Sequence, residues 1–93
     1  MNVSMSMRPS TDVVYQRVGE ELVLVHLKTN QIYALNETGA RFWELVCEGR
    51  SRPEIESQML EEFDVEPAAL AGEIDALLVE LESVGAVEVT TGT

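Results

Sequence analysis

The chain offers few side chains that could perform covalent chemistry. It contains one histidine, His26, and one cysteine, Cys47. A hydrolase or lyase needs a nucleophile paired with a base, or a metal held by several ligands. His26 falls in the middle of a predicted strand and Cys47 on the apolar face of a predicted helix, so we interpret both as structural residues. We therefore expect a protein with no catalytic residues, one that is not an enzyme.

Carboxylates are numerous, but they fall outside the apolar stripes of the predicted helices, as side chains of a solvated face do. Examples are Glu61, Glu62 and Glu80. The sequence has no glycine-rich phosphate loop, no metal-ligand spacing and no nucleophile elbow. We expect no cofactor and no bound metal. A binding function is therefore favoured over a catalytic one.

The net charge of the chain limits the kinds of partner that it can bind. Six Lys and Arg against seventeen Asp and Glu give a net charge of −11. Nucleic-acid binding requires cations that neutralise phosphates, so we expect no nucleic-acid partner. The acidity serves either solubility or the attraction of a basic partner. The sequence lacks a run of about 18 apolar residues, so we expect no transmembrane helix. It also lacks a secretory signal. The lone cysteine is consistent with a reducing compartment. We expect a cytoplasmic protein with no membrane contact.

The first half of the chain has the pattern of a small antiparallel sheet. Residues 13–18, 21–27 and 32–35 are rich in β-branched and apolar residues. Gly19 and Glu20 fit a two-residue hairpin turn, and Asn30 is suited to a positive φ in the second turn. The pattern predicts a three-stranded meander in which the third strand lies at an edge.

The pattern then changes to a period of 3.6 residues, which predicts three helices. Asn36 is placed to cap the first helix and Gly49 to end it. Ser51 opens a capping box for the second helix, and the third and longest helix covers residues 67–84. We predict an α+β fold with a three-stranded antiparallel N-terminal sheet followed by three helices.

Ninety-three residues make one domain with one modest core. We expect residues 1–11 to form a flexible N-terminal tail, residues 12–90 to form the domain, and residues 91–93 to fray. Residues 86–90 could add a short extended segment or a wing.

The edge of the third strand is the candidate binding site. Gln31–Leu35 contains no charge and no proline, the devices that usually protect a strand edge. An extended peptide could pair there as an additional strand. The alternatives are that residues 86–90 or a second copy of the chain cover this edge.

Main-chain pairing alone would bind too weakly. Four or five hydrogen bonds at roughly 0.5–1.5 kcal/mol each give a few kcal/mol, whereas a micromolar complex needs about −8 kcal/mol. We expect the third helix to supply the rest through a groove with Leu78 as its apolar floor and Asp75 and Glu82 as its acidic rim. The predicted peptide-binding residues are Asn30, Gln31, Ile32, Tyr33, Ala34, Leu35, Ala71, Ile74, Asp75, Leu78 and Glu82.

Several of these segments resemble a known family. The matching pieces are residues 30–40, which include the run Leu-Asn-Glu-Thr-Gly-Ala, then 42–45 and 48–49, and later 74–81 and 85–87. They resemble the PqqD-like family of peptide-recognition domains, the recognition elements of ribosomally made and post-translationally modified peptides. Asn30 departs from the family, where glycine is common, but both residues tolerate the turn.

The resemblance implies a fold like a winged helix-turn-helix, used for peptides rather than DNA. It implies a precursor whose leader peptide pairs with Gln31–Leu35 and reaches Asp75 and Leu78. A free-standing chain of this length is most similar to the leader-binding protein of lasso-peptide pathways. Its partners would be a separate leader peptidase of the cysteine-protease type and an ATP-dependent cyclase. The nearest alternative is a PqqD proper, which delivers its peptide to a radical-SAM enzyme.

Two further classes remain open at this point. A winged-helix DNA-binding regulator has the same order of helices, but the net charge of −11 opposes it. A dimerisation module would use the same strand edge to pair with itself.

Overall fold

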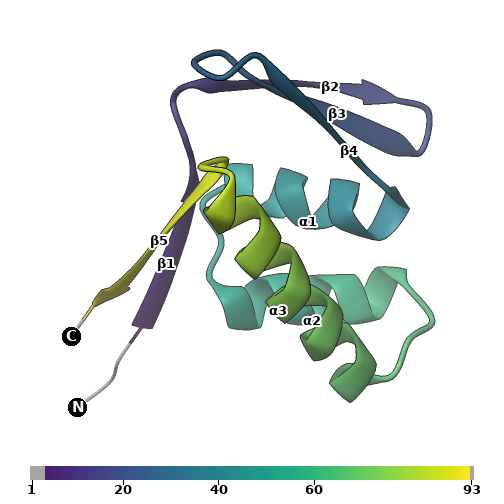
Figure 1. Cartoon of the computed structure of the whole chain (residues 1–93). Coiled ribbons are helices and arrows are strands. Elements are labelled where there is room, and N and C mark those ends of the chain that lie inside the picture. The colour runs from purple at the N-terminus through teal and green to yellow at the C-terminus, as the bar shows by residue number, and fades with distance from the viewer. Residues whose placement is uncertain (1–3, 93) are drawn as a thin grey trace.

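Residues 4–92, the part that the computed structural model describes, fold as two antiparallel sheets and three helices. The elements follow in the order β1 (Ser4–Pro9), β2 (Val13–Val18), β3 (Glu21–His26), β4 (Gln31–Leu35), α1 (Glu37–Cys47), α2 (Arg52–Glu62), α3 (Pro67–Ser83) and β5 (Val87–Gly92). Figure 1 shows the sheet β2–β3–β4 over α1, with α2 and α3 on the other side of that helix, and the ribbon β1–β5 extending away from them. The predicted α+β order of three strands and then three helices is confirmed.

Two tight turns shape the three-stranded sheet. Gly19 has a φ of 64° and Asn30 a φ of 59°, the left-handed values that each turn requires. Both residues were expected at these turns. In the resulting register Leu24 of β3 lies opposite Tyr15 of β2 and Tyr33 of β4. Alternate residues therefore point toward α1 along all three strands.

The second sheet corrects the expected N-terminal tail. Ser4–Pro9 forms β1, which pairs along its whole length with β5. Met7 lies opposite Val89 and is buried in the core at 4% exposure. The strand was missed because its Ser-Met pattern has weak strand propensity and its partner lies at the other end of the chain. The expected extended segment after residue 85 is present as β5, which continues through Gly92, while Thr93 lies outside the described residues.

The helix boundaries follow from local capping chemistry. Asn36 Oδ1 accepts a hydrogen bond from the Gly39 N–H at 2.9 Å, and Ser51 forms a complete capping box at the start of α2. Gly49 and Gly85 follow α1 and α3 with φ values of 80° and 76°. The roles of Asn36, Gly49 and Ser51 were predicted from the sequence.

The core lies between the sheet and the helices. Leu22 and Leu24 point inward from β3 and are fully buried against the side of α1 that carries Phe42 and Trp43. The Tyr15 ring meets the Trp43 ring edge to face, with 5.8 Å between the ring centroids. None of the helices described has the length and apolar content that crossing a bilayer requires.

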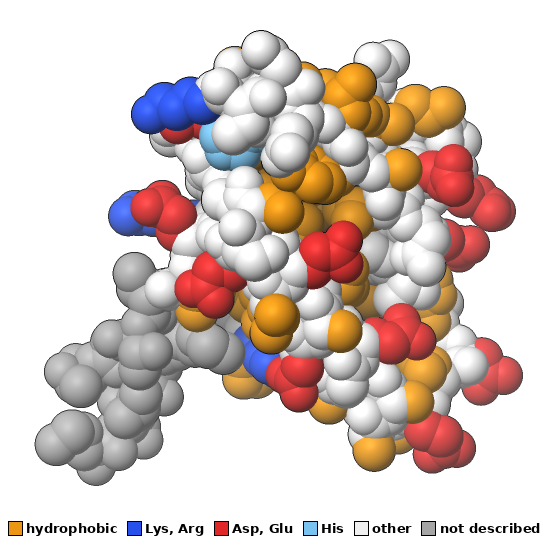
Figure 2. All heavy atoms as spheres, in the orientation of Figure 1, with side chains coloured by type: hydrophobic (Ala, Val, Ile, Leu, Met, Phe, Trp, Pro, Cys, Tyr) orange, Lys and Arg blue, Asp and Glu red, His pale blue; other side chains and the backbone are white. Residues whose placement is uncertain are grey.

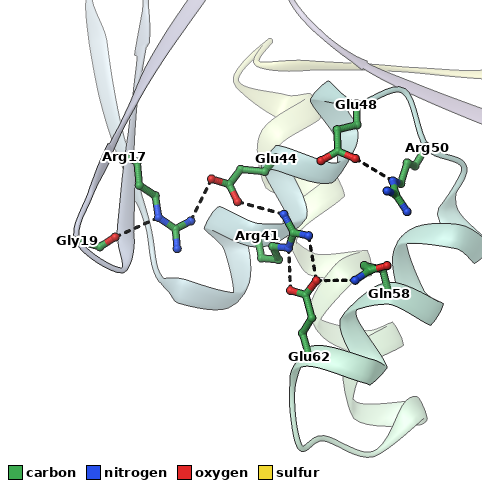
Figure 3. Close-up of polar contacts among 8 residues, drawn as sticks. All are labelled: Arg17, Gly19, Arg41, Glu44, Glu48, Arg50, Gln58 and Glu62. Carbon is green, nitrogen blue, oxygen red and sulfur yellow. Dashed lines mark hydrogen bonds and ion pairs between the residues drawn. The ribbon is translucent and has the colours of Figure 1, made fainter.

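A row of polar contacts ties the sheet to two helices. Glu44 on α1 contacts Arg17 of β2 at 3.3 Å and Arg41 at 3.4 Å, and Arg41 makes two bonds of 2.7 and 2.9 Å to Glu62 of α2 (Figure 3). The Arg41 guanidinium lowers the pKa of the Glu62 carboxyl, and the Gln58 amide adds to the effect. The row holds the β2–β3 hairpin, α1 and α2 in a fixed relation.

Candidate functional site

One edge of β4 has no strand partner among the described residues. β4 pairs with β3 along Gln31–Leu35, and its other edge is left open. β5, which the sequence allowed as a cover for this edge, pairs with β1 instead. The exposed edge therefore presents unpaired main-chain N–H and C=O groups, as strand addition requires.

Side chains along β4 alternate between two environments. Ile32 and Ala34 point to the outer face of the sheet, where Ile32 is 68% exposed. Tyr33 is half-buried and Leu35 is buried on the inner face. The Tyr33 hydroxyl donates to Oε1 of Gln31, two residues before it. A peptide strand added to this edge would also place alternate side chains on the two faces.

Leu77 of α3 lies near Leu35, the last residue of β4. A Cβ atom added at Gly39 would lie 3.3 Å from Leu35 Cβ and 3.4 Å from Leu77 Cδ2. The strand, the first turn of α1 and α3 therefore meet at Gly39, and the missing side chain allows the close approach. This contact identifies which side of α3 faces the strand.

The strand-facing flank of α3 follows from that contact. Residues three, four and seven positions from one another share a helix face. The strand-facing flank thus comprises Glu73, Leu77, Glu80 and Val84. Leu77 and Val84 are half-buried, while Glu73 and Glu80 are exposed. Figure 2 shows a hollow between β4 and α3 with apolar side chains inside it and acidic side chains beside it.

The opposite flank of α3 faces α2. Arg52, at the start of α2, contacts Asp75 Oδ1 through Nη1 at 2.7 Å and donates through Nη2 to the Ala71 carbonyl at 3.2 Å. Its Nε atom donates to Glu56 at 2.7 Å. The α2-facing flank comprises Ala71, Asp75, Leu78 and Glu82.

The structure gives the predicted helical residues contacts of their own. Asp75 is committed to an ion pair with Arg52, and the Ala71 backbone is bonded to the same guanidinium. Leu78, expected as the groove floor, is 7% exposed and belongs to the core with Ile74. Asn30 and Gln31–Leu35 form the turn and the open strand as predicted, but the structure does not bring the α2-facing flank to that strand.

The different burial of Leu77 and Leu78 could not be predicted from periodicity. Leu77 and Leu78 are adjacent apolar residues, so periodicity alone allows either one to lie at the margin of the buried stripe. Leu78, the expected groove floor, is the buried one of the two, and Leu77 is half-buried. Arg52 could have indicated which flank of α3 faces α2, because a cation on α2 can pair with only one flank of a neighbouring helix.

The electrostatics of the two flanks differ accordingly. No ion pair of the described residues involves Glu73 or Glu80, and β4 itself carries no charge. The groove beside β4 thus has an apolar interior and an acidic, unneutralised margin on α3. Such a margin favours a basic or neutral peptide over an acidic one.

The two residues considered for chemistry have structural surroundings. Burial raises the pKa of the Cys47 thiol and so disfavours the reactive thiolate. His26 is 8% exposed, and its Nδ1 atom accepts a hydrogen bond from the Lys28 N–H at 3.3 Å. Within residues 4–92, His, Cys, Asp and Glu side chains form no group of three or more that could hold a metal ion.

Comparison with known families agrees with the arrangement of elements. Residues 21–87 match the family model for coenzyme PQQ synthesis protein D, PqqD. The chain belongs to the PqqD family. A search of curated proteins found no match.

Two solved structures share the fold. One is TbiB1 in complex with the TbiA(beta) leader peptide, at 28% sequence identity and a TM-score of 0.82, covering 87% of this chain and 94% of TbiB1. The other is a lasso peptide synthetase B1 complexed with the leader peptide, at 21% identity and a TM-score of 0.79, covering 88% of this chain and 96% of that one. This PqqD-family chain therefore shares nearly the whole extent of both folds.

Proposed function

We propose that the chain is a non-catalytic adaptor that binds the leader segment of a ribosomally made precursor peptide. The observation that carries the proposal is the open edge of β4 beside the strand-facing flank of α3. The likeness to TbiB1, whose structure holds a leader peptide, supports it. The leader pairs with Gln31–Leu35 as an added strand, and its inward side chains contact Leu77 and Val84.

The energy of binding divides between two sources. Main-chain bonds to β4 contribute a few kcal/mol and are insensitive to sequence. Apolar contacts to the strand-facing flank add roughly 25 cal/mol for each Å² removed from water and select the peptide. The exposed acids Glu73 and Glu80 disfavour acidic side chains at that wall.

In this role the adaptor presents its peptide to a maturation enzyme. The partner that we propose is the separate leader peptidase of the cysteine-protease type in lasso-peptide biosynthesis, acting with an ATP-dependent cyclase. The synthetase B1 fold supports this choice over other pathways. The chain supplies position and selection, and the enzyme supplies the chemistry.

A second candidate has its own support. The matched family model describes a coenzyme PQQ synthesis protein. In that case the same groove delivers its peptide to a radical-SAM enzyme. The peptide-binding site is identical in both candidates, and only the enzyme differs.

Fluorescence anisotropy tests the proposed binding. The probes are the labelled TbiA(beta) leader and the labelled leader of any short precursor encoded beside this chain. We expect saturable binding in the micromolar range or tighter by the neighbouring leader, and none by a scrambled peptide of the same composition. Equal affinity for the leader and the scrambled peptide would contradict the proposed adaptor function.

A further inference from the structure

The sheet has a second open edge, along β2. In the part of the chain that the structure describes, Val13–Val18 pairs only with β3 and contains no proline. Its one charged residue, Arg17, is directed to Glu44 of α1 at 3.3 Å and to the Gly19 carbonyl at 3.0 Å. The edge therefore lacks the freely extended charge that usually prevents strand pairing.

The side chains around this edge are apolar and exposed. Val14 and Tyr15 are each 49% exposed and Val18 is 55% exposed. A hollow of about 260 Å³ opens on the outer face of the sheet beside them, lined by Val14, Tyr15, Gln16, Val18, Val23 and Val25. Apolar side chains and unpaired main-chain groups thus occur together at one edge.

The residue order of β2 is complementary to itself. Residues directly opposite each other in an antiparallel pair point to the same face of the sheet. If Gln16 lies opposite Gln16 of a second copy, Val14 lies opposite Val18 on the outer face. On the inner face, Tyr15 then lies opposite Arg17. The pairs that result are apolar with apolar on the outer face and amide with amide at the axis.

We propose that the β2 edge is a self-association surface, at which two copies pair antiparallel about Gln16. The two three-stranded sheets become one continuous sheet in the order β4–β3–β2–β2–β3–β4. Such an interface is isologous, so every favourable pair away from the axis occurs twice. A second copy suits this edge better than an unrelated strand because each exposed side chain meets a matching one.

Net charge limits the strength of the pairing. Each copy carries −11, so two copies repel each other over distances that salt screens. The dimer is therefore weak, and salt strengthens it. Salt would weaken an association carried by attraction between opposite charges, so the sign of the salt effect separates the two kinds of contact.

The pairing leaves the proposed peptide site accessible. Both β4 edges lie at the far ends of the joined sheet, on the side of each sheet opposite to β2. If the proposed function holds, a dimer carries two leader peptides at once. The self-association itself does not depend on that function.

Sedimentation velocity tests the proposal on the full chain. Wild-type protein is measured from about 10 µM to about 1 mM, the range that weak association populates, in about 0.05 M and about 0.5 M NaCl. We expect a dimer fraction that rises with concentration and with salt. A protein that stays monomeric throughout would overturn the proposal.

A matched pair of variants localises the contact. Gln16→Lys places two cations opposite each other at the axis, whereas Ser57→Lys makes the same charge change at an exposed position on α2. We expect the first variant to lose the dimer, the second to keep it, and both to bind leader peptide as wild type does. A dimer that persists in Gln16→Lys would mean another interface and would overturn the proposal.

Cross-linking provides a second readout that does not depend on weak equilibrium populations. In a Cys47→Ser background, Gln16→Cys places two thiols opposite each other, at a Cβ separation of about 4.5–5.5 Å, close to that of a disulfide. We expect Gln16→Cys to form the linked dimer at least about tenfold faster than Ser57→Cys under mild oxidation, because pairing raises the effective concentration of its thiols. Equal rates would contradict pairing about Gln16.

Discussion

The two flanks of α3 carry similar side chains but occupy different surroundings. Each flank has two acidic residues, one leucine and one smaller apolar residue. The strand-facing set is Glu73, Leu77, Glu80 and Val84, and the α2-facing set is Ala71, Asp75, Leu78 and Glu82. On the α2-facing flank Arg52 neutralises Asp75 and bonds the Ala71 carbonyl. On the strand-facing flank Leu77 approaches β4 and the acids remain unpaired.

The comparison shows that the type of a residue does not decide whether it binds a ligand or stabilises the fold. A carboxylate that already has a half-buried cation beside it is part of the structure. An exposed carboxylate with no such partner is available to a ligand. We therefore expect substitutions on the α2-facing flank to change stability, and those on the strand-facing flank to change peptide affinity.

The largest effect on affinity is expected for Leu77→Glu. This change replaces the apolar wall beside β4 with a third acid, and the loss of about 1.5–3 kcal/mol of apolar contact lowers leader affinity by roughly 10- to 100-fold. Anisotropy titration with the labelled leader measures it. The matched control is Val79→Glu, at a position that is 69% exposed.

Val79→Glu should bind the leader within about twofold of wild type, since it adds the same charge away from the groove. Circular dichroism melts establish that both variants are folded. Equal affinity of the two folded variants would contradict the assignment of the strand-facing flank.

The next largest effect is expected on stability, from Arg52→Met. The change removes bonds to Glu56, Asp75 and the Ala71 carbonyl. We expect the free energy of unfolding to fall by about 1–2 kcal/mol, because a side chain only 19% exposed loses several partners. Urea denaturation measures the change. At a temperature where the variant is folded, its affinity for the leader should stay within about twofold of that of wild type. A larger loss of affinity would place the α2-facing flank in the peptide-binding site.

Asp75→Ala should have a smaller effect of the same kind. The Asp75 side chain is 64% exposed, so its ion pair with Arg52 contributes less than about 1 kcal/mol to stability. We expect a slightly lower denaturation midpoint and no change in leader affinity. Asp75→Ala combined with Arg52→Met should be less destabilising than the sum of the single changes, because the pair is shared. Strict additivity would show that the pair is not formed in solution.

A pH series tests the ion pair between Arg41 and Glu62. Arg41 lowers the pKa of Glu62 in the folded state. The ion pair therefore stabilises the fold at pH values above the unfolded pKa of about 4.3. This stabilisation is lost as the pH falls through the lower pKa of the folded state. We expect wild type to melt at a higher temperature than Glu62→Gln at pH 7, and the difference to shrink as the pH falls below about 4.3. A difference in melting temperature between wild type and Glu62→Gln that stays the same at low pH would contradict the role of the ion pair.

Local signals in the sequence were sufficient for much of this fold. Gly19, Asn30, Asn36 and Ser51 each determine a turn or a cap through chemistry confined to a few residues, and the structure has all four as expected. The open strand Gln31–Leu35 was likewise visible, because it lacks charge and proline.

The remaining features depend on contacts between distant parts of the chain. β1 is a strand because β5 pairs with it, and no pattern within Ser4–Pro9 indicates that partner. The position of Arg52 beside Asp75 likewise results from the packing of α2 against α3. Periodicity defines the buried stripe of α3 but not the neighbour of each margin, so the sequence alone did not show which flank lies beside β4.

The central claim is that the leader pairs with β4 beside the strand-facing flank of α3. It is tested most directly by NMR of the isotope-labelled chain bound to an unlabelled leader peptide. We predict cross-strand NOEs from the peptide to Gln31–Leu35, with further contacts to the side chains of Leu77 and Val84. NOEs to Val13–Val18, or contacts confined to the α2-facing flank, would contradict the claim.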